Sequence, residues 1–170
     1  KESGARVFGL DLNAGDMGEI AEFIHCDVGS SASVAEAFAV IGERTEVIDV
    51  LVNNAGIGAV GGIEQATDDE WTSVLNVNVV GISRVSSAAL PLMRNSDAGS
   101  IVNTCSIAAT VGLPNRAIYS ASKGAVQSLT RALAADLIRE NIRVNCVNPG
   151  TADTPWVARL LDLALDPAAA

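Results

Sequence analysis

The sequence predicts an α/β fold of the doubly wound parallel type, formed as a single domain by residues 1–170. Short apolar runs alternate with helical patterns, and neighbouring parallel strands need such helical crossovers. A length of 170 residues suits one hydrophobic core. Hydrophobic residues make up 49% of the chain and charged residues 18%, which is typical of a folded globular protein.

The predicted strands are short and rich in β-branched residues, which favours parallel strands buried in a sheet. They are the runs 6–10, 22–26, 47–52, 100–104 and 142–147. Between them, two patterns of serine or threonine followed three positions later by glutamate predict helix starts. These capping boxes are Ser33–Glu36 and Thr67–Glu70.

The charge balance indicates a small-molecule partner. Eleven basic residues against twenty acidic ones give a formal net charge of -9, so the average surface repels nucleic acid phosphates and anionic lipids. The longest apolar runs are much shorter than the roughly 20 residues of a membrane-spanning helix, and Lys1–Gly4 does not resemble a signal peptide. We expect a cytoplasmic protein that binds neither membranes nor nucleic acids.

Metal and hydrolase chemistry are not predicted. The three cysteines, Cys26, Cys105 and Cys146, include no CxxC pair, so we expect free thiols and no metal site. The single histidine, His25, lies within a predicted strand and is interpreted as a packing or edge residue. A serine hydrolase is excluded because this histidine lies in an early strand and the chain has no GxSxG turn.

Tyr119 and Lys123 are the first candidates for catalysis. They lie four residues apart in a stretch whose apolar residues, Val126, Leu129, Leu133 and Leu137, mark one helix face. Residues four apart on a helix are neighbours, so the ammonium can approach the phenol oxygen. A nearby cation favours phenolate and lowers the pKa of a tyrosine toward the range of a general acid or base.

Ser106 follows the predicted strand 100–104, and the carboxyl ends of strands in open α/β sheets are where ligands bind. A hydroxyl there can stabilise charge on a substrate oxygen, but a turn serine that caps a helix is an equally good interpretation. The run Asn53–Gly56 follows the predicted strand 47–52 and consists of small and amide residues. A flat ligand could approach the backbone there, but the same residues also form ordinary turns.

Together these motifs resemble the classical short-chain dehydrogenase/reductase family. The family order is an NNAG motif, a helix asparagine, a serine, YxxxK and a PG motif. Here the corresponding residues are Asn53–Gly56, Asn78, Ser106, Tyr119 with Lys123, and Pro149 with Gly150. The resemblance covers essentially the whole chain and implies a Rossmann fold.

The resemblance implies an NAD-dependent oxidoreductase that interconverts a secondary alcohol and a ketone by hydride transfer. Tyr119 would exchange the proton, Lys123 would lower its pKa and hold the nicotinamide ribose, and Ser106 would orient the substrate oxygen. Asn78 would support a water-linked proton relay. Tyr119 and Ser106 would contact the substrate, and Trp156 is a candidate for the pocket wall.

The resemblance also implies a set of cofactor contacts. Asp11 ends the first predicted strand, where a carboxylate accepts from the ribose hydroxyls and repels a 2′-phosphate, so NAD is expected over NADP. Asp27 and Val28 resemble the adenine-contacting pair. The other expected cofactor contacts, besides Tyr119 and Lys123, are Asn54, Ala55, Gly56, Pro149, Gly150, Thr151 and Thr154.

The glycine-rich TGxxxGxG turn that opens the family pattern is not found in this sequence. Without its strand the sheet should be split, because that strand lies between the second and the fourth. We therefore expect an N-terminal βα unit of about 25 residues ahead of Lys1. At the other end, we expect a C-terminal strand beyond the sequence.

Two alternatives stay open at this point. A non-catalytic scaffold or binding module would explain the missing phosphate loop, whereas a sugar-nucleotide epimerase shares YxxxK but fits Asn78 poorly. The run 148–156 resembles members that act on sugars, sugar acids and small hydroxy acids. A homo-oligomer, either a tetramer or a dimer, is the expected assembly, with Ala121, Ala125 and Ala132 permitting close helix packing.

Overall fold

Five parallel strands alternate with helices along the chain, which confirms the predicted α/β class. The computed structural model describes residues 4–152. Its strands are β1 (Phe8–Asp11), β2 (Glu22–His25), β3 (Val50–Asn53), β4 (Gly99–Thr104) and β5 (Ile142–Val147). Each overlaps a predicted run, with bounds that differ by up to three residues.

Four α-helices and several single turns connect the strands. The α-helices are α1 (Ser31–Gly42), α2 (Asp68–Leu75), α3 (Gly81–Met93) and α4 (Ala117–Leu137). A π-helical turn, η2 (Asn76–Val80), joins α2 to α3 in one long helical run. The short turns are η1 (Met17–Glu19), η3 (Ile107–Ala109) and η4 (Ile138–Glu140).

The described strands form two separate sheets, as the sequence predicts. One has the order β1-β2 and the other the order β3-β4-β5, and every pairing is parallel. A single core cluster nevertheless joins them through α1 and α3. It includes Ile24 of β2, Phe38 of α1, Met93 of α3 and Ile101 of β4.

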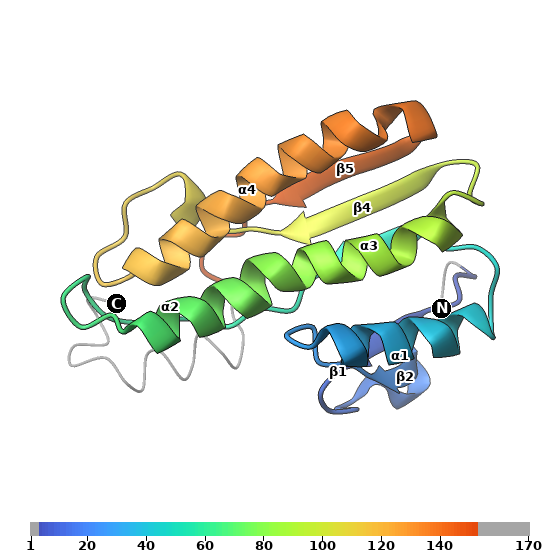
Figure 1. Ribbon diagram of the computed structural model, residues 1–170, viewed down its shortest axis with the longest axis horizontal. Coiled ribbons are helices and arrows are strands. Elements are labelled where there is room, and N and C mark those ends of the chain that lie inside the picture. The colour runs from blue at the N-terminus through green and yellow to red at the C-terminus, as the bar shows by residue number, and fades with distance from the viewer. Residues whose placement is uncertain (1–3, 153–170) are drawn as a thin grey trace.

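The long helices α1, α3 and α4 cover one face of the strands, and Figure 1 looks onto these helices. Side chains alternate along a strand, so Leu51 of β3 packs toward the core while Val50 and Val52 point the other way. Val50 is 60% exposed and Val52 58% exposed. The prediction of a buried strand therefore holds for only one face of β3 in the described residues.

One predicted helix cap is confirmed and the other is wrong. Thr67 caps α2 by accepting from the Glu70 N–H at 3.2 Å. At α1 the cap is Ser30, whose extended backbone precedes the first helical residue and whose hydroxyl accepts from the Ser33 N–H. Ser33 lies inside the first turn, and its hydroxyl instead accepts from the Asp27 N–H at 2.9 Å.

The helical run 68–93 is long enough and, with a mean hydropathy of 1.2, apolar enough to cross a membrane. In this fold it is a core helix, because Val85, Ala89 and Met93 pack into the cluster that joins the sheets.

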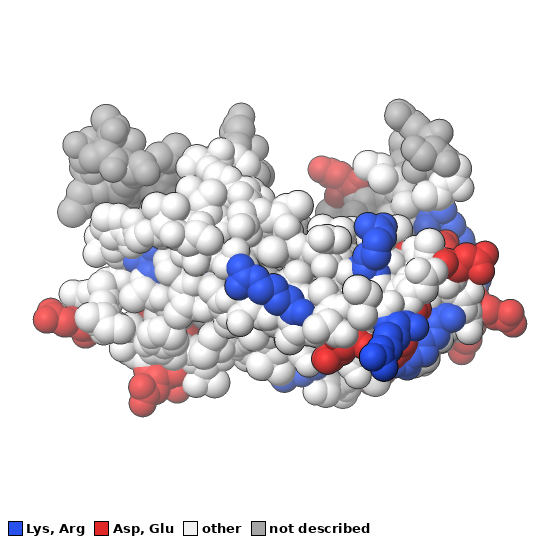
Figure 2. Space-filling view, turned by 90° about the horizontal axis from the view of Figure 1, so that it is seen from above, with Lys and Arg blue, Asp and Glu red and all other residues white. Residues whose placement is uncertain are grey.

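Seen from above in Figure 2, the visible described face carries scattered side chains of both charges, without a continuous basic patch. Arg94 and Glu140 form an ion pair at 2.6 Å.

The cysteine and histidine positions agree with the interpretation of the sequence. All three cysteines are free thiols; Cys26 and Cys105 are buried, and Cys146 is partly buried. His25 is exposed at the end of β2. Among residues 4–152, no three histidine, cysteine, aspartate or glutamate side chains lie close enough together to hold a metal ion.

A buried chain of polar side chains crosses the core between the strands and helices. Asn53 of β3 donates to Asn103 Oδ1 of β4 at 2.9 Å and to the Ser86 hydroxyl of α3 at 3.2 Å. Asn103 donates to the Thr130 hydroxyl of α4 at 2.9 Å, and this hydroxyl donates to the Val126 carbonyl. Asn53 and Asn103 are also partners in the strand register, so the chain fixes that register.

Replacing Thr130 with valine should destabilise the fold, because Asn103 would keep a buried N–H without its acceptor. We expect Thr130→Val to lower the free energy of unfolding by about 1–3 kcal/mol, measured by urea denaturation. Thr72→Val, at an exposed site in α2, is the matched control and should change it by less than about 0.5 kcal/mol. Equal effects of the two substitutions would contradict this role.

Candidate active site

The carboxyl ends of the parallel strands bring several predicted site residues to one edge of the sheet. Asn54–Gly56 follow β3, Ser106 follows β4 and Pro149 follows β5. The Ile107 N–H donates to the Pro149 carbonyl at 3.0 Å, which ties the last two loops together. Helix α4 begins beyond this edge and runs back along the sheet (Figure 1).

Tyr119 and Lys123 lie one turn apart near the start of α4, as the sequence predicts. Lys123 Nζ lies 5.7 Å from the centroid of the Tyr119 ring. The lysine is only 5% exposed, and its ammonium donates to the Thr104 carbonyl at 2.8 Å. Burial lowers the pKa of Lys123 below its ordinary value, and the nearby Cys105 thiol partly opposes this shift.

Asn78 is almost fully buried in the π turn η2 and holds the loop after β3. Its side chain accepts from the Ile57 N–H at 2.8 Å and donates to the Ile57 carbonyl at 2.9 Å. It also donates to the Ser122 hydroxyl at 3.0 Å, and Ser122 donates to the Tyr119 carbonyl. Asn78 therefore links the loop after β3 to the helix that carries the tyrosine. Single π turns within helices often mark functional sites.

Gly56 shows how closely these groups meet. A Cβ at this position would lie 3.3 Å from Asn78 Oδ1 and 3.7 Å from Lys123 Nζ. The absence of a side chain lets the backbone of this loop approach both groups. Gly56, Asn78 and Lys123 are thus brought together from three elements that are far apart in the sequence.

Ser106 combines the two interpretations that the sequence leaves open. It precedes η3 and its hydroxyl accepts from the Ala108 N–H at 3.1 Å, so it is a capping serine. The side chain is buried at the end of β4. Because a hydroxyl both accepts and donates, the cap does not use the Ser106 proton.

Two residues of this centre were missed by sequence reasoning. The Thr104 carbonyl accepts a hydrogen bond from Lys123 Nζ, and the Thr104 hydroxyl donates to Asn54 Oδ1 at 3.0 Å. Ser122 lies between Tyr119 and Asn78. Their places in the sequence were an indication of a role in the site, since Thr104 ends a predicted strand close to Ser106 and Ser122 lies inside the YxxxK motif.

The predicted cofactor residues divide between the two sheets. Asp11 is the last residue of β1, and Asp27 follows the end of β2. Asn54, Ala55 and Gly56 follow β3 and lie with the catalytic candidates. Asp11 is exposed and its Oδ1 accepts from the Asn13 N–H at 3.1 Å. Pro149, Gly150 and Thr151 are exposed after β5, and the predictions for Thr154 and Trp156 lie outside the described residues.

Comparison with known proteins gives consistent matches across the chain. The short chain dehydrogenase family model matches residues 4–162. Trans-4-hydroxycyclohexanecarboxylate dehydrogenase of Sinomonas cyclohexanicum is 42% identical over 156 residues, which cover 92% of this chain and 60% of that protein. The chain therefore spans three fifths of the length of this relative.

Solved structures agree with this match. Ligand-free aldohexose dehydrogenase of Thermoplasma acidophilum superimposes with a TM-score of 0.90 at 36% identity, covering 96% of this chain and 64% of that chain. A variant of actinorhodin polyketide ketoreductase with NADPH gives a TM-score of 0.89 at 33% identity, covering 95% and 67%. Family pattern, sequence identity and three-dimensional likeness thus agree: the chain belongs to the short-chain dehydrogenase/reductase family.

Proposed function

We propose that the protein to which this chain belongs is a nicotinamide-dependent oxidoreductase that interconverts secondary alcohols and ketones, with Tyr119 as the proton-exchanging group. The observation that carries this proposal is the convergence of Gly56, Asn78 and the buried Lys123 ammonium next to Tyr119. A charged lysine is rarely buried without a purpose. Here the cation faces the ring of the chain's single tyrosine.

The residues of the site fit a nicotinamide cofactor. Gly56 brings backbone without a side chain close to Lys123 Nζ, and an ammonium has three N–H donors, one of which the Thr104 carbonyl uses. We assign Lys123 and Asn54–Gly56 to the nicotinamide half, with the exposed Pro149–Thr151 beside it. The bound cofactor supplies the hydride acceptor or donor, and this chain supplies position and electrostatics.

Each proposed catalytic group has a distinct task. In ketone reduction the Tyr119 hydroxyl donates its proton to the carbonyl oxygen, and the ammonium of Lys123 stabilises the phenolate that remains. The Ser106 hydroxyl donates to the same substrate oxygen, which stabilises its developing negative charge. Asn78 holds the loop after β3 and, through Ser122, the first turn of α4.

We propose NAD as the preferred cofactor because Asp11 ends β1 with an exposed carboxylate. This group accepts from the ribose hydroxyls and repels a 2′-phosphate. The adenine end is assigned to Asp27 and Val28.

For the substrate we propose a small ring-bearing secondary alcohol, such as a sugar or a hydroxylated carboxylic acid. This class is supported by the names of two similar proteins, which act on a hydroxycyclohexane acid and on aldohexoses.

The rival function is a non-catalytic scaffold that has kept the fold. In a non-catalytic scaffold, the buried Lys123 ammonium beside Tyr119 would lower the stability of the fold and would contribute nothing to function. A screen of ring-bearing alcohols with the full-length protein, followed by NADH absorbance, separates the two. Binding of NADH without turnover of any alcohol would favour the scaffold.

Removing the phenol oxygen should abolish turnover and leave cofactor binding almost unchanged. We expect Tyr119→Phe to lower kcat at least about 100-fold, because it deletes the general acid or base, while NADH fluorescence titration gives nearly the same Kd. Lys123→Ala should weaken both turnover and binding. A near-normal rate for the phenylalanine variant would exclude Tyr119 from proton exchange.

The affinity for NADH should fall at alkaline pH as Lys123 loses its proton. Because burial lowers the pKa of Lys123, the fall should begin below the ordinary lysine value of 10.5. Lys123→Arg keeps its charge at all accessible pH values, so its affinity, although weaker, should stay constant over the same range. Equal pH dependence of the two proteins would assign the titration to another group.

The coenzyme preference should depend on the carboxylate of Asp11. We expect Asp11→Ser to raise the ratio of kcat/KM for NADP to that for NAD by about tenfold or more, since it removes a like charge next to the 2′-phosphate, worth about 1.4 kcal/mol per factor of ten. Asp16→Ser, at another exposed aspartate of the same connection, is the control. An unchanged ratio in the Asp11 variant would contradict the assignment.

A further inference from the structure

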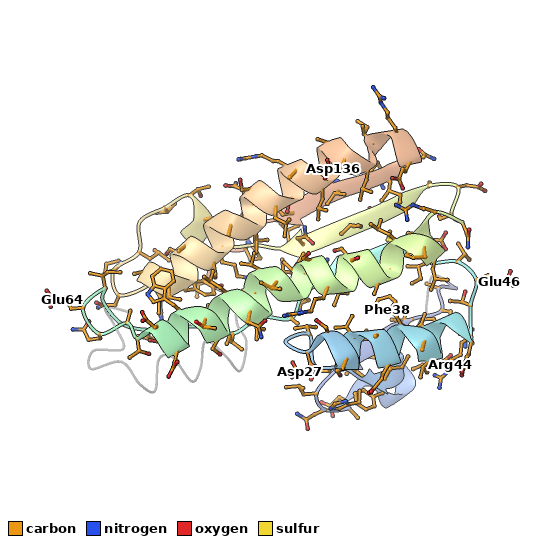
Figure 3. All side chains as sticks on the ribbon, viewed as in Figure 1. Asp27, Phe38, Arg44, Glu46, Glu64 and Asp136 are labelled. Atoms are coloured by element: carbon orange, nitrogen blue, oxygen red, sulfur yellow. The ribbon has the colours of Figure 1, made fainter. Side chains whose placement is uncertain are left out.

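The loop between β2 and α1, formed by Asp27, Val28 and Gly29, is held at each of its residues. The Asp27 N–H donates to the Ser33 hydroxyl at 2.9 Å, and the Asp27 carboxylate accepts from the Gly29 N–H at 2.8 Å. Figure 3 labels Asp27 next to the start of α1, and the long α2–α3 run lies above α1 in the same view. The contacts to Val28 and Gly29 come from that run.

All three guanidinium nitrogens of Arg84 on α3 donate hydrogen bonds here, one of them to the loop itself. Nη1 donates to the Val28 carbonyl at 3.1 Å, and Nε donates to the Ser31 hydroxyl at 3.0 Å. Nη2 donates to Asn76 Oδ1 at 2.8 Å. Among residues 4–152, Arg84 forms no ion pair, so its donors go to neutral acceptors.

Asn76 completes the contact from the first position of the π turn. Its amide accepts from Arg84 and donates to the Gly29 carbonyl at 3.1 Å. Next to it, Gly81 lies against Val28: a Cβ on this glycine would lie 3.0 Å from Val28 Cγ2 and 3.3 Å from its carbonyl oxygen. The long helical run thus reaches the loop by two polar side chains and by one close backbone approach.

We propose that Arg84 and Asn76 form a clamp that positions the β2–α1 loop for the adenine end of the cofactor. They are positioning residues, since they act through Asp27 and Val28. The inference rests on the proposed cofactor assignment of that loop. The fixed, planar fork of arginine suits this task, because one rigid group joins Val28, Ser31 and Asn76.

A preformed loop lowers the ordering cost of binding, so loss of the clamp should weaken affinity. The effect should be confined to ligands that contain the adenosine half. The chemical step should be spared, because the clamp's hydrogen bonds go to Val28, Gly29 and Ser31 and to no atom of Ser106 or Lys123 in the described structure.

The test compares Arg84→Lys with Arg131→Lys in the full-length protein. The first keeps the charge but loses the fork, and the second is the same change at an exposed position on α4. Fluorescence and calorimetric titrations with NADH, ADP-ribose and reduced nicotinamide mononucleotide give the affinities. We expect Arg84→Lys to weaken NADH and ADP-ribose about tenfold, to leave the mononucleotide within about twofold, and to leave kcat at saturating NAD within about twofold.

Hydrogen exchange of the ligand-free protein gives a second readout that needs no cofactor. The amides of Gly29 and Ser30 should exchange several-fold faster in Arg84→Lys than in the wild type, with no change in Arg131→Lys. Asn76→Asp keeps the acceptor for Arg84 and loses the donor to Gly29, so it should produce a smaller change of the same kind.

The outcomes separate this inference from the proposed function. If the wild type binds NADH but Arg84→Lys weakens the mononucleotide as much as NADH, or leaves NADH affinity unchanged, the clamp is overturned and the enzyme assignment stands. If the wild type binds neither NADH nor ADP-ribose, the proposed function fails and the cofactor role of the clamp fails with it. Faster exchange at Gly29 would then show a structural contact alone.

Discussion

The buried ammonium of Lys123 is the interaction on which the rest of the site depends. A charge with 5% exposure requires compensation, and here it is provided by the Thr104 carbonyl at the end of β4. A second contact joins the same two segments, because the Cys105 thiol donates to the Lys123 backbone carbonyl at 3.0 Å. These reciprocal contacts fix the first turns of α4 against the strand that leads into Ser106, so that the tyrosine, the lysine and the serine belong to one rigid unit.

Behind that unit, the chain from Asn53 through Asn103 to Thr130 serves a different purpose. It is fully enclosed, and each member pairs with another. Such a network specifies one register and one helix position where an apolar core would tolerate several. Because Asn53 directly precedes Asn54 and Thr130 lies on α4, the network also fixes the relative position of the loop and the helix that form the site.

The sequence predicts what depends on local spacing. Tyr119 and Lys123 are four residues apart on a helix, and the strands are short β-branched runs, so both were found. Arg84, Thr104 and Ser122 were missed because each has a decisive contact with a segment distant in the sequence, and position alone, next to Ser106 or inside the YxxxK motif, does not identify that partner. Ser33 was mistaken for the cap of α1 because several serines lie together and the backbone angle of Ser30 decides among them. Val50 and Val52 show a further limit: β-branched residues predict a strand but do not tell which faces are covered.

The π turn at Asn76–Val80 determines which sides of α2 and α3 face their partners. A π turn accommodates one extra residue, and one residue corresponds to about 100° of rotation around a helix axis. If this turn became regular α-helix with no residue removed, α3 would turn by about that angle relative to α2. Asn78 could then contact Ile57, or Arg84 could contact Val28, but one continuous helix could not present both. The irregular turn is thus the phase shift that lets a single helix serve two separate loops.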